Sequence, residues 1–208
     1  MEPSVPQVPF GRLQCTGRDP IRALLAREPD WARQMPFHQD PVGTQLHQYY
    51  RRGRTSPVVE VQWKAVAEGW REDGCAVLPG SRVSLVLSLG ELQPAAVSGL
   101  LRMEPTRAFA KGEVLHGSSR VRDHGLWIRE VDLPGWHWPE ENLAELVAML
   151  RAEPRWQEVL ELPGMQRAQV AVAYYGAVES MAGMHLDREL VAELGQLGLE
   201  MDVDLYAC

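Results

Sequence analysis

The chain has 208 residues, of which 45% are hydrophobic and 24% are charged, a composition that excludes wholesale disorder and predicts a sizeable buried core. No stretch of about 18 consecutive apolar residues is present, which argues against a transmembrane helix. The formal net charge of −7 argues against partners that are themselves anionic, namely nucleic acids and acidic membranes.

The negative charge is concentrated in the second part of the chain. Residues 1–80 carry ten Lys and Arg against nine Asp and Glu, a net of +1, whereas residues 81–208 carry eleven against nineteen, a net of −8. An acidic domain attracts basic partners, although a moderate charge also simply keeps a protein in solution. The three cysteines form no Cys-x-x-Cys pair, and residues 1–10 lack the basic and apolar regions of a signal peptide. We therefore expect a cytoplasmic protein.

Residues 1–80 are predicted to form a helical N-terminal extension. Asp19 precedes a helix that begins at Pro20, and Thr44 caps a second helix that ends in a basic run at residues 51–54. A third helix over residues 57–73 is the clearest, because its apolar residues recur at helical spacing: Val59, Trp63, Val66 and Trp70. The density of β-branched residues at 58–61 favours a short strand as the alternative.

A change from helical to alternating periodicity predicts a separate domain over residues 81–208. Alternating apolar residues indicate strands at residues 83–89, 107–111, 126–128, 168–175 and 201–206. Caps, prolines and apolar stripes indicate helices at residues 94–103, 139–150, 154–162 and 188–197. Residues 112–123 are expected to form an exposed loop.

The resulting order, β-α-β-β-α-α-β-α-β, predicts the α+β fold class. Amphipathic helices of this length cover one face of a sheet and leave the polar alternate positions on the other face. The expected architecture is a ferredoxin-like split β-α-β sheet with helices on one face and an added α-β unit.

Several short segments of this domain resemble the bacterial domain-of-unknown-function family 4279. They follow one another in the family's order over residues 81–206: Ser84 to Ser88, Glu104-Pro105-Thr106-Arg107, Lys111-Gly112, Gly125-Leu126-Trp127, Tyr174-Tyr175, Gly183-Met184-His185-Leu186 and Asp202 to Tyr206. The family has no established activity, so the resemblance assigns none to this chain. Some members of the family are acidic and compact in the manner of immunity or antitoxin proteins, and residues 1–80 lie outside the resemblance.

Local motifs point to no catalytic residue, cofactor or metal. The chain has no G-x-S-x-G, Walker loop or G-x-G-x-x-G. His185 and Asp187, with the strand-borne Asp202 and Asp204, have the residue types of a metal site, but an exposed acidic face is the favoured interpretation. A ligand pocket between the N-terminal helices and the sheet would draw on a basic, aromatic and histidine set: Arg107, Lys111, Tyr174, Tyr175 and His185.

The segment Trp136-His137-Trp138 is the most unusual local feature of the sequence. Two exposed indoles would be typical anchors of a protein interface, whereas a buried tryptophan would staple the helix that follows. Both interpretations remain open. The predicted partner-binding residues combine this segment with nearby and strand-borne acids: Trp136, His137, Trp138, Glu140, Glu141, Asp202 and Asp204.

Two hypotheses on function follow from these observations. The first is a non-catalytic, immunity-type or antitoxin-type protein that docks on a basic partner protein, such as a toxin, and neutralises it. The second is a small-molecule-binding protein or an enzyme that uses the pocket described above. The acidic domain and the absence of catalytic motifs favour the first.

Overall fold

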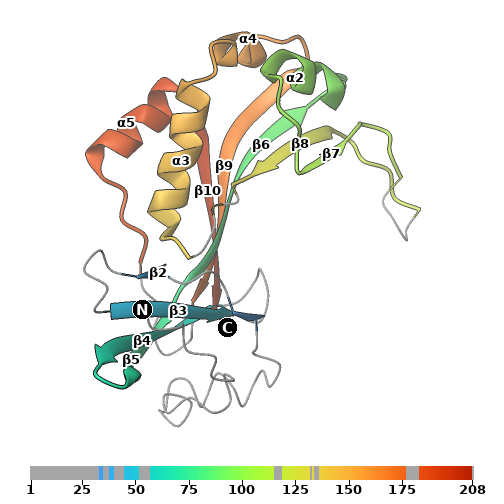
Figure 1. Ribbon diagram of the computed structural model, residues 1–208. Helices are drawn as coiled ribbons and strands as arrows, with labels where there is room; N and C mark the ends of the chain where they lie inside the picture. Colours follow the sequence, from blue (N-terminus) through green and yellow to red (C-terminus); the bar gives the residue numbers. More distant parts are fainter. Residues whose placement is uncertain are drawn as a thin grey trace.

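Two β-sheets and four helices make up the described part of the computed structural model, which covers residues 33–34, 38–39, 45–51, 57–114, 119–131, 133, 136–176 and 183–207. The first sheet lies at one end of the molecule, and α2 and α4 lie at the other end, beyond the second sheet (Figure 1). Among the described residues, no helix is long and apolar enough to cross a membrane.

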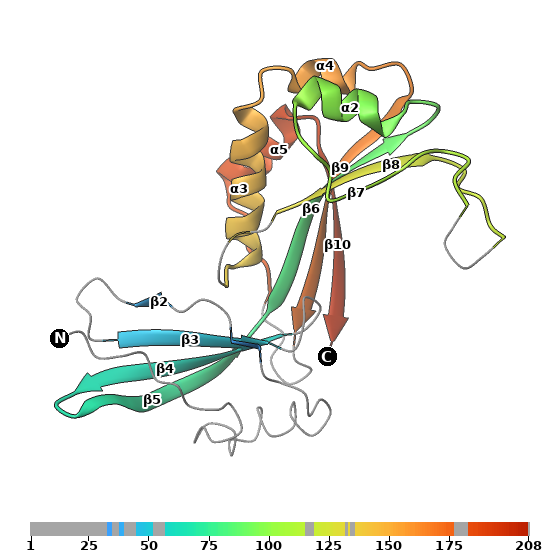
Figure 2. The same ribbon diagram turned by 45° about the vertical axis from the view of Figure 1, so that its right-hand side comes forward.

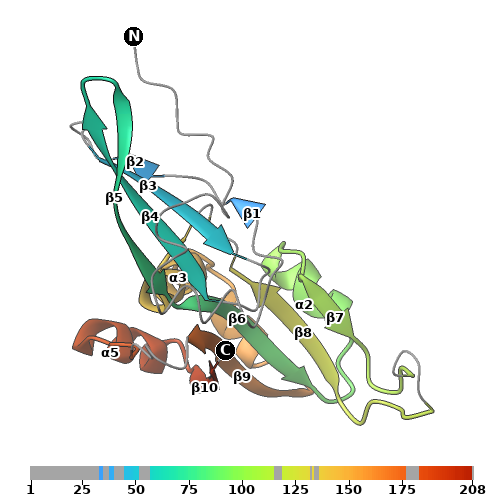
Figure 3. The same cartoon turned by 90° about the horizontal axis from the view of Figure 1, so that it is seen from below.

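The first sheet is antiparallel throughout. It contains β1 (Arg33–Gln34), β2 (His38–Gln39), β3 (Gln45–Arg51), β4 (Val58–Val66) and β5 (Gly69–Leu78). The strands follow the order β1-β3-β4-β5, and β2 also pairs with β3. The long hairpin of β4 and β5 projects away from the second sheet (Figure 3).

The predicted helices at residues 44–54 and 57–73 are wrong, because these segments form β3, β4 and β5. The pairs Leu46–Trp63, Gln48–Val61 and Tyr50–Val59 place six buried side chains on one face of the sheet. In a strand, residues that are two or four apart share a face, and in a helix residues that are four apart do so as well. The spacing of Val59 and Trp63 therefore fits both structures. The alternative strand at residues 58–61 is the correct interpretation. The predicted helix at Pro20 lies outside the described residues.

The second sheet contains β6 (Gly80–Leu89), β7 (Arg107–Phe109), β8 (Gly125–Glu130), β9 (Met165–Gly176) and β10 (Glu200–Ala207). Their order is β10-β9-β6-β8-β7. The β10–β9 pair is parallel and the other pairs are antiparallel. β5 ends at Leu78 and β6 begins at Gly80, so the two sheets are joined through Pro79 alone.

Four helices connect these strands: α2 (Pro94–Leu101), α3 (Pro139–Arg151), α4 (Trp156–Leu160) and α5 (Arg188–Gln196). The chain order from β6 to β10 is the predicted β-α-β-β-α-α-β-α-β. The α+β class is therefore confirmed. The predicted loop at residues 112–123 contains an isolated bridge between Val114 and Val121, both exposed.

All four helices contribute to one core on one face of the second sheet. Alternate residues of β6, namely Val83, Leu85, Leu87 and Leu89, form its floor together with Trp127 of β8 and Val170 and Val172 of β9. The helices add Val97, Leu101, Leu143, Leu146, Val147, Leu150, Trp156, Val159, Leu190 and Leu194. The strand residues between these core positions point to the opposite face, which the four helices leave uncovered.

Candidate functional site

The uncovered face of the second sheet holds a shallow hollow of about 170 Å³. We call this side the open face and define it by six lining residues that come from all five strands: Arg82, Arg107, Ile128, Tyr175, Asp204 and Tyr206. Register explains their meeting, because Arg82 pairs with Ala173, which in turn pairs with Asp204, and paired residues share a face. The open face therefore brings Arg107 and Tyr175, which were predicted as ligand-binding residues, together with Asp204, which was predicted to bind a partner protein.

The buried carboxylate of Glu130 is neutralised by Arg82 of the open face. Arg82 Nε donates to Glu130 Oε1 at 3.1 Å, and the Glu130 side chain is nearly buried. The Glu130 backbone N–H donates to the Thr106 hydroxyl at 3.0 Å. Because this ion pair is sheltered, it is screened less than a fully exposed pair and holds the Arg82 guanidinium in place.

Two tyrosines stack at the border of the open face. The rings of Tyr175 and Tyr206 lie 5.1 Å apart at 18°. The Tyr206 hydroxyl lies 3.5 Å from Asp204 Oδ2, and the negative charge of Asp204 is the main cause that raises the pKa of Tyr206 above its ordinary value. Tyr206 therefore keeps its proton, which its hydroxyl donates to Asp204 beside the stacked rings.

β10 forms the border of the second sheet (Figure 2). Most of its residues are exposed. Met201, Leu205 and Tyr206 are 39%, 65% and 46% exposed. Asp202 and Asp204 are also exposed, and neither has an ion-pair partner among the described residues. β10 thus combines apolar side chains with unpaired carboxylates at the edge of a sheet.

The Trp136-His137-Trp138 segment lies where the two sheets approach each other. Trp136 stacks on Tyr49 of β3 with ring centroids 5.9 Å apart, and its indole N–H donates to the Pro79 carbonyl at 2.8 Å. Trp138 meets Trp136 edge-on at 4.8 Å and is 38% exposed. Trp136 therefore joins the two sheets within the molecule, and Trp138 keeps an exposed surface.

The first turn of α3 carries Glu140 and Glu141. Glu141 Oε2 accepts from the Trp138 backbone N–H at 2.7 Å, which caps the helix, and lies 3.7 Å from His137 Nδ1. Glu140 Oε1 accepts from the His185 backbone N–H at 2.5 Å. The predicted partner-binding residues thus fall in two places, the start of α3 and the strand β10.

The predicted ligand-binding residues do not gather into one site. Arg107 and Tyr175 lie on the open face, whereas Tyr174 points to the helix side, where burial and Glu140 raise the pKa of its hydroxyl. In the described part of the chain, that hydroxyl has no hydrogen-bond partner. Lys111 pairs with Glu91 at 2.5 Å, and His185 is exposed before α5. No group of three potential metal ligands occurs among the described residues.

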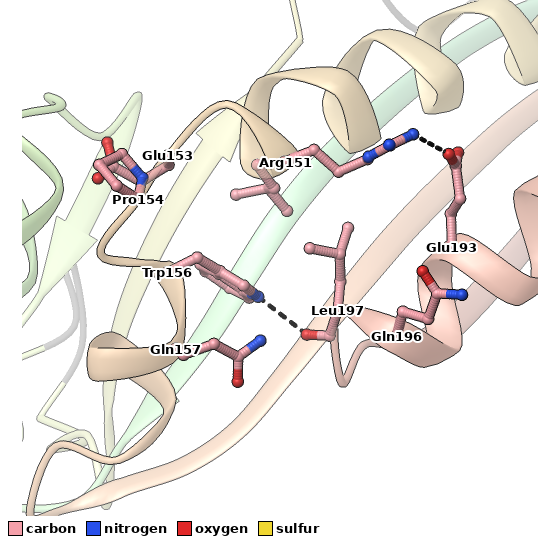
Figure 4. Close-up of a pocket in the computed structure, with 9 residues that line it drawn as sticks. Arg151, Glu153, Pro154, Trp156, Gln157, Glu193, Gln196 and Leu197 are labelled. Atoms are coloured by element: carbon pink, nitrogen blue, oxygen red, sulfur yellow. Dashed lines mark hydrogen bonds and ion pairs between the residues drawn. The ribbon is translucent and has the colours of Figure 1, made fainter.

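A second hollow, of about 370 Å³, lies between α3, α4 and α5 (Figure 4). Its floor includes Trp156, whose indole N–H donates to the Leu197 carbonyl at 2.9 Å. Arg151 and Glu193 form an ion pair along its rim. None of its lining residues was predicted as a site residue, because their spacing in the sequence indicates only helices.

The sequence prediction missed three of the six open-face residues: Arg82, Ile128 and Tyr206. For Arg82 and Tyr206 the signal was available, since Tyr206 lies two residues after Asp204 and Arg82 lies two before Ser84, so strand alternation puts each pair on one face.

Comparison with known proteins assigns this part of the chain to a family. The family model described as "Domain of unknown function (DUF4279)" matches residues 80–208, which is more than half of the chain. The match covers the whole second sheet and its helices, and confirms the resemblance seen in the sequence. No curated protein and no solved structure gave a significant match. The chain therefore belongs to the DUF4279 family.

Proposed function

We propose that the chain is a non-catalytic protein-binding module of the immunity type, which docks on a basic partner protein in the cytoplasm and neutralises it. The observation that carries the proposal is the composition of β10. Of the large hydrophobic side chains exposed in the described structure, three share this one strand, Met201, Leu205 and Tyr206. Clustered exposed apolar side chains beside polar groups are typical of protein interaction sites.

Charge supports a basic partner. Asp202 and Asp204 flank Val203 on β10, and residues 81–208 carry a net charge of −8. Complementary charge speeds association and selects partners of opposite sign. Trp138, Glu140 and Glu141 at the start of α3 supply a second group of aromatic and acidic residues on the same domain.

The proposal is tested by capture and reconstitution with the full chain. The native host lysate is passed over the immobilised wild-type chain and over the variant Asp202→Asn/Asp204→Asn. Glu68→Gln/Glu145→Gln is the matched control, because both glutamates are exposed and lie outside β10. A basic protein retained by the wild type and the control is then purified and titrated against the chain by calorimetry.

We expect a one-to-one complex whose affinity decreases as the salt concentration rises, because salt screens the attraction between the carboxylates and the basic partner. At low salt, the Asp202→Asn/Asp204→Asn variant should bind the partner more weakly than the wild type does. Loss of the partner's activity on binding would support neutralisation. Failure to recover any stoichiometric partner, or equal binding by the variant and the wild type, would rule the proposal out.

A second candidate function is small-molecule binding in the hollow of the open face. It is favoured by the meeting of Arg107, Tyr175 and Arg82 around one concave surface. A thermal-shift screen of metabolites checks it, since a ligand at 100 times its Kd stabilises a protein by about 2.7 kcal/mol. A stabilising metabolite whose effect disappears in Arg107→Gln would favour this function over protein binding.

We further propose that β6 to β9 form a ferredoxin-like split β-α-β unit to which α5 and β10 are added. The order β9-β6-β8-β7 supports this, because the first and third strands of the unit are central and antiparallel. The parallel pairing of β10 with β9 agrees with a crossover through α5. A solved structure of the domain would test this assignment.

A further inference from the structure

β10 has an outer edge that no other described strand covers. It is the last strand of its sheet, and β9 is its sole pairing partner among the described residues. Its register with β9 runs from Glu200 to Ala207 without a shift. Alternate backbone N–H and C=O groups of such a strand point away from the sheet and are available to another strand.

The other sheet edges carry features that discourage strand addition. β7, at the opposite edge of the same sheet, is three residues long. β5, at the edge of the first sheet, has a register shift against β4. β10 has neither a bulge, a proline nor a lysine, and short strands, bulges and such residues are the usual protection.

The charges on β10 argue against a second copy of this chain as the added strand and favour a basic segment. If a second copy paired antiparallel in the register centred on Val203, Asp202 would lie opposite Asp204 on the open face. Like charges placed directly opposite each other destabilise a strand pair. Glu200 already pairs with Arg167 at 2.6 Å, so Asp202 and Asp204 are the carboxylates left for a partner.

We infer that β10 accepts an extended basic segment of the partner protein as a sixth strand of the second sheet. This inference rests on the proposed function and specifies how the partner is held. Cationic side chains of the segment lie opposite Asp202 and Asp204 on the open face. Apolar side chains at the alternate positions cover Met201 and Leu205 on the other side.

The probe is a fluorescent peptide as long as β10 in which lysine and valine alternate, with a block-ordered peptide of the same composition as control. Binding to the full chain is followed by anisotropy. Two further peptides carry N-methyl groups on the valine amides or on the lysine amides. In an extended peptide, the valine amides point to one edge and the lysine amides to the other. Each set of N-methyl groups therefore removes the hydrogen-bond donors of one edge and leaves the charge of the peptide unchanged.

We expect the alternating peptide to bind at least about tenfold more tightly than the block peptide, and one N-methylated peptide to lose binding while the other retains it. Asp202→Asn/Asp204→Asn should weaken binding by about tenfold, because two cross-strand charge pairs are lost. Glu68→Gln/Glu145→Gln should leave binding unchanged. Hydrogen exchange should slow at alternate amides of β10.

Equal binding by all four peptides would overturn the inference and indicate attraction by charge alone. Lack of binding by the alternating peptide would overturn it as well. The two proposals fail separately. A native partner that binds without protecting β10 amides would contradict strand addition and leave the proposed function standing. Peptide binding at β10 without any native partner would contradict the proposed function and leave strand addition standing.

Discussion

Tyr49 shows how a single hydroxyl comes to sit between two acids. Its ring is almost fully buried against Trp136. Burial, the charge of Glu60 on the neighbouring strand and the charge of Glu141 in α3 together raise the pKa of Tyr49 to about 12. A phenolate here would lack solvent and face two carboxylates, so the folded protein strongly favours the protonated form.

This shift predicts a loss of stability at alkaline pH. Tyrosine in the unfolded chain has its ordinary pKa of about 10, whereas the pKa of Tyr49 in the folded protein is about 12. The free energy of unfolding should therefore fall as pH rises from about 10 through 12. Urea unfolding at a series of alkaline pH values measures this, and Tyr49→Phe should remove its share of the slope.

Absorbance titration provides the control for that assignment. Glu60→Gln should lower the pKa of Tyr49, and Glu141→Gln should lower it less, because Glu60 makes the larger electrostatic contribution. An unchanged slope in Tyr49→Phe, or no response to either glutamine, would contradict the account.

Neighbouring residues also show what the sequence can and cannot predict about a site. Tyr174 and Tyr175 were assigned to one ligand site, yet they lie on opposite faces of β9. Alternation along a strand predicts that they separate. Tyr174 shares its face with Val170 and Val172, so the same alternation indicates that Tyr174 faces the core. Which residues of other strands join Tyr175 depends on how β9 pairs with β6 and β10, and the local pattern does not contain that information.

At the scale of elements, predictions succeeded where a segment carried its own start and stop. Asp187 caps α5 by accepting from the Leu190 N–H at 2.8 Å, and Gly198 follows the helix with φ +68°. Proline begins α2 and α3. These signals act locally, so they can be read before any tertiary contact is known.

Predictions failed for β3 to β5 because the spacing of their apolar residues also fits a helix, and the pairing of the strands decides between the two. Gln48 is buried between Leu46 and Tyr50, and a polar residue at that position hides the alternation of β3. Gln48 accepts from the Tyr50 hydroxyl at 3.1 Å, which satisfies one of its polar atoms. In the next segment, Val59, Trp63, Val66 and Trp70 fit a helical stripe that is longer than the alternative strand at residues 58–61, and the helical interpretation prevailed for that reason.

The α5 cap yields a prediction at this scale. Asp187→Ala should reduce the free energy of unfolding by about 1 kcal/mol, because it removes the acceptor for an N–H in the first turn. Asp187→Ser should restore most of the loss. Chemical denaturation measures both variants against Asp123→Ala, an exposed loop aspartate that should have little effect. Equal effects of Asp187→Ala and Asp123→Ala would mean that the cap is unimportant.

At the scale of the whole molecule, the second sheet has a core of its own. Every residue of that core lies between Val83 and Leu197, with Leu199 and Val203 packed against it. A separate small cluster between the two sheets consists of Tyr49, Val58, Leu78 and Trp136. Among the described residues, this cluster of two aromatic and two aliphatic side chains packs the first sheet against the second.

We predict that residues 80–208 alone fold cooperatively. In the full chain, Trp136→Ala should lower the free energy of unfolding by about 2 kcal/mol, because it removes the Tyr49 stack and the hydrogen bond to Pro79. The same substitution should have a much smaller effect in the fragment, which lacks both contacts. Urea unfolding of the four proteins measures the difference, and an unfolded fragment would show that the domain depends on the first sheet.

The single-residue junction at Pro79 has a consequence for how the molecule tumbles. The Pro79 ring fixes its own φ, and strands continue on both sides of it, so the two sheets have almost no hinge between them. Amide relaxation in β4 and β9 should report one shared rotational correlation time, and residual dipolar couplings from both sheets should fit one alignment tensor. A partner bound at β10 would then slow the rotation of the distant β4–β5 hairpin as well.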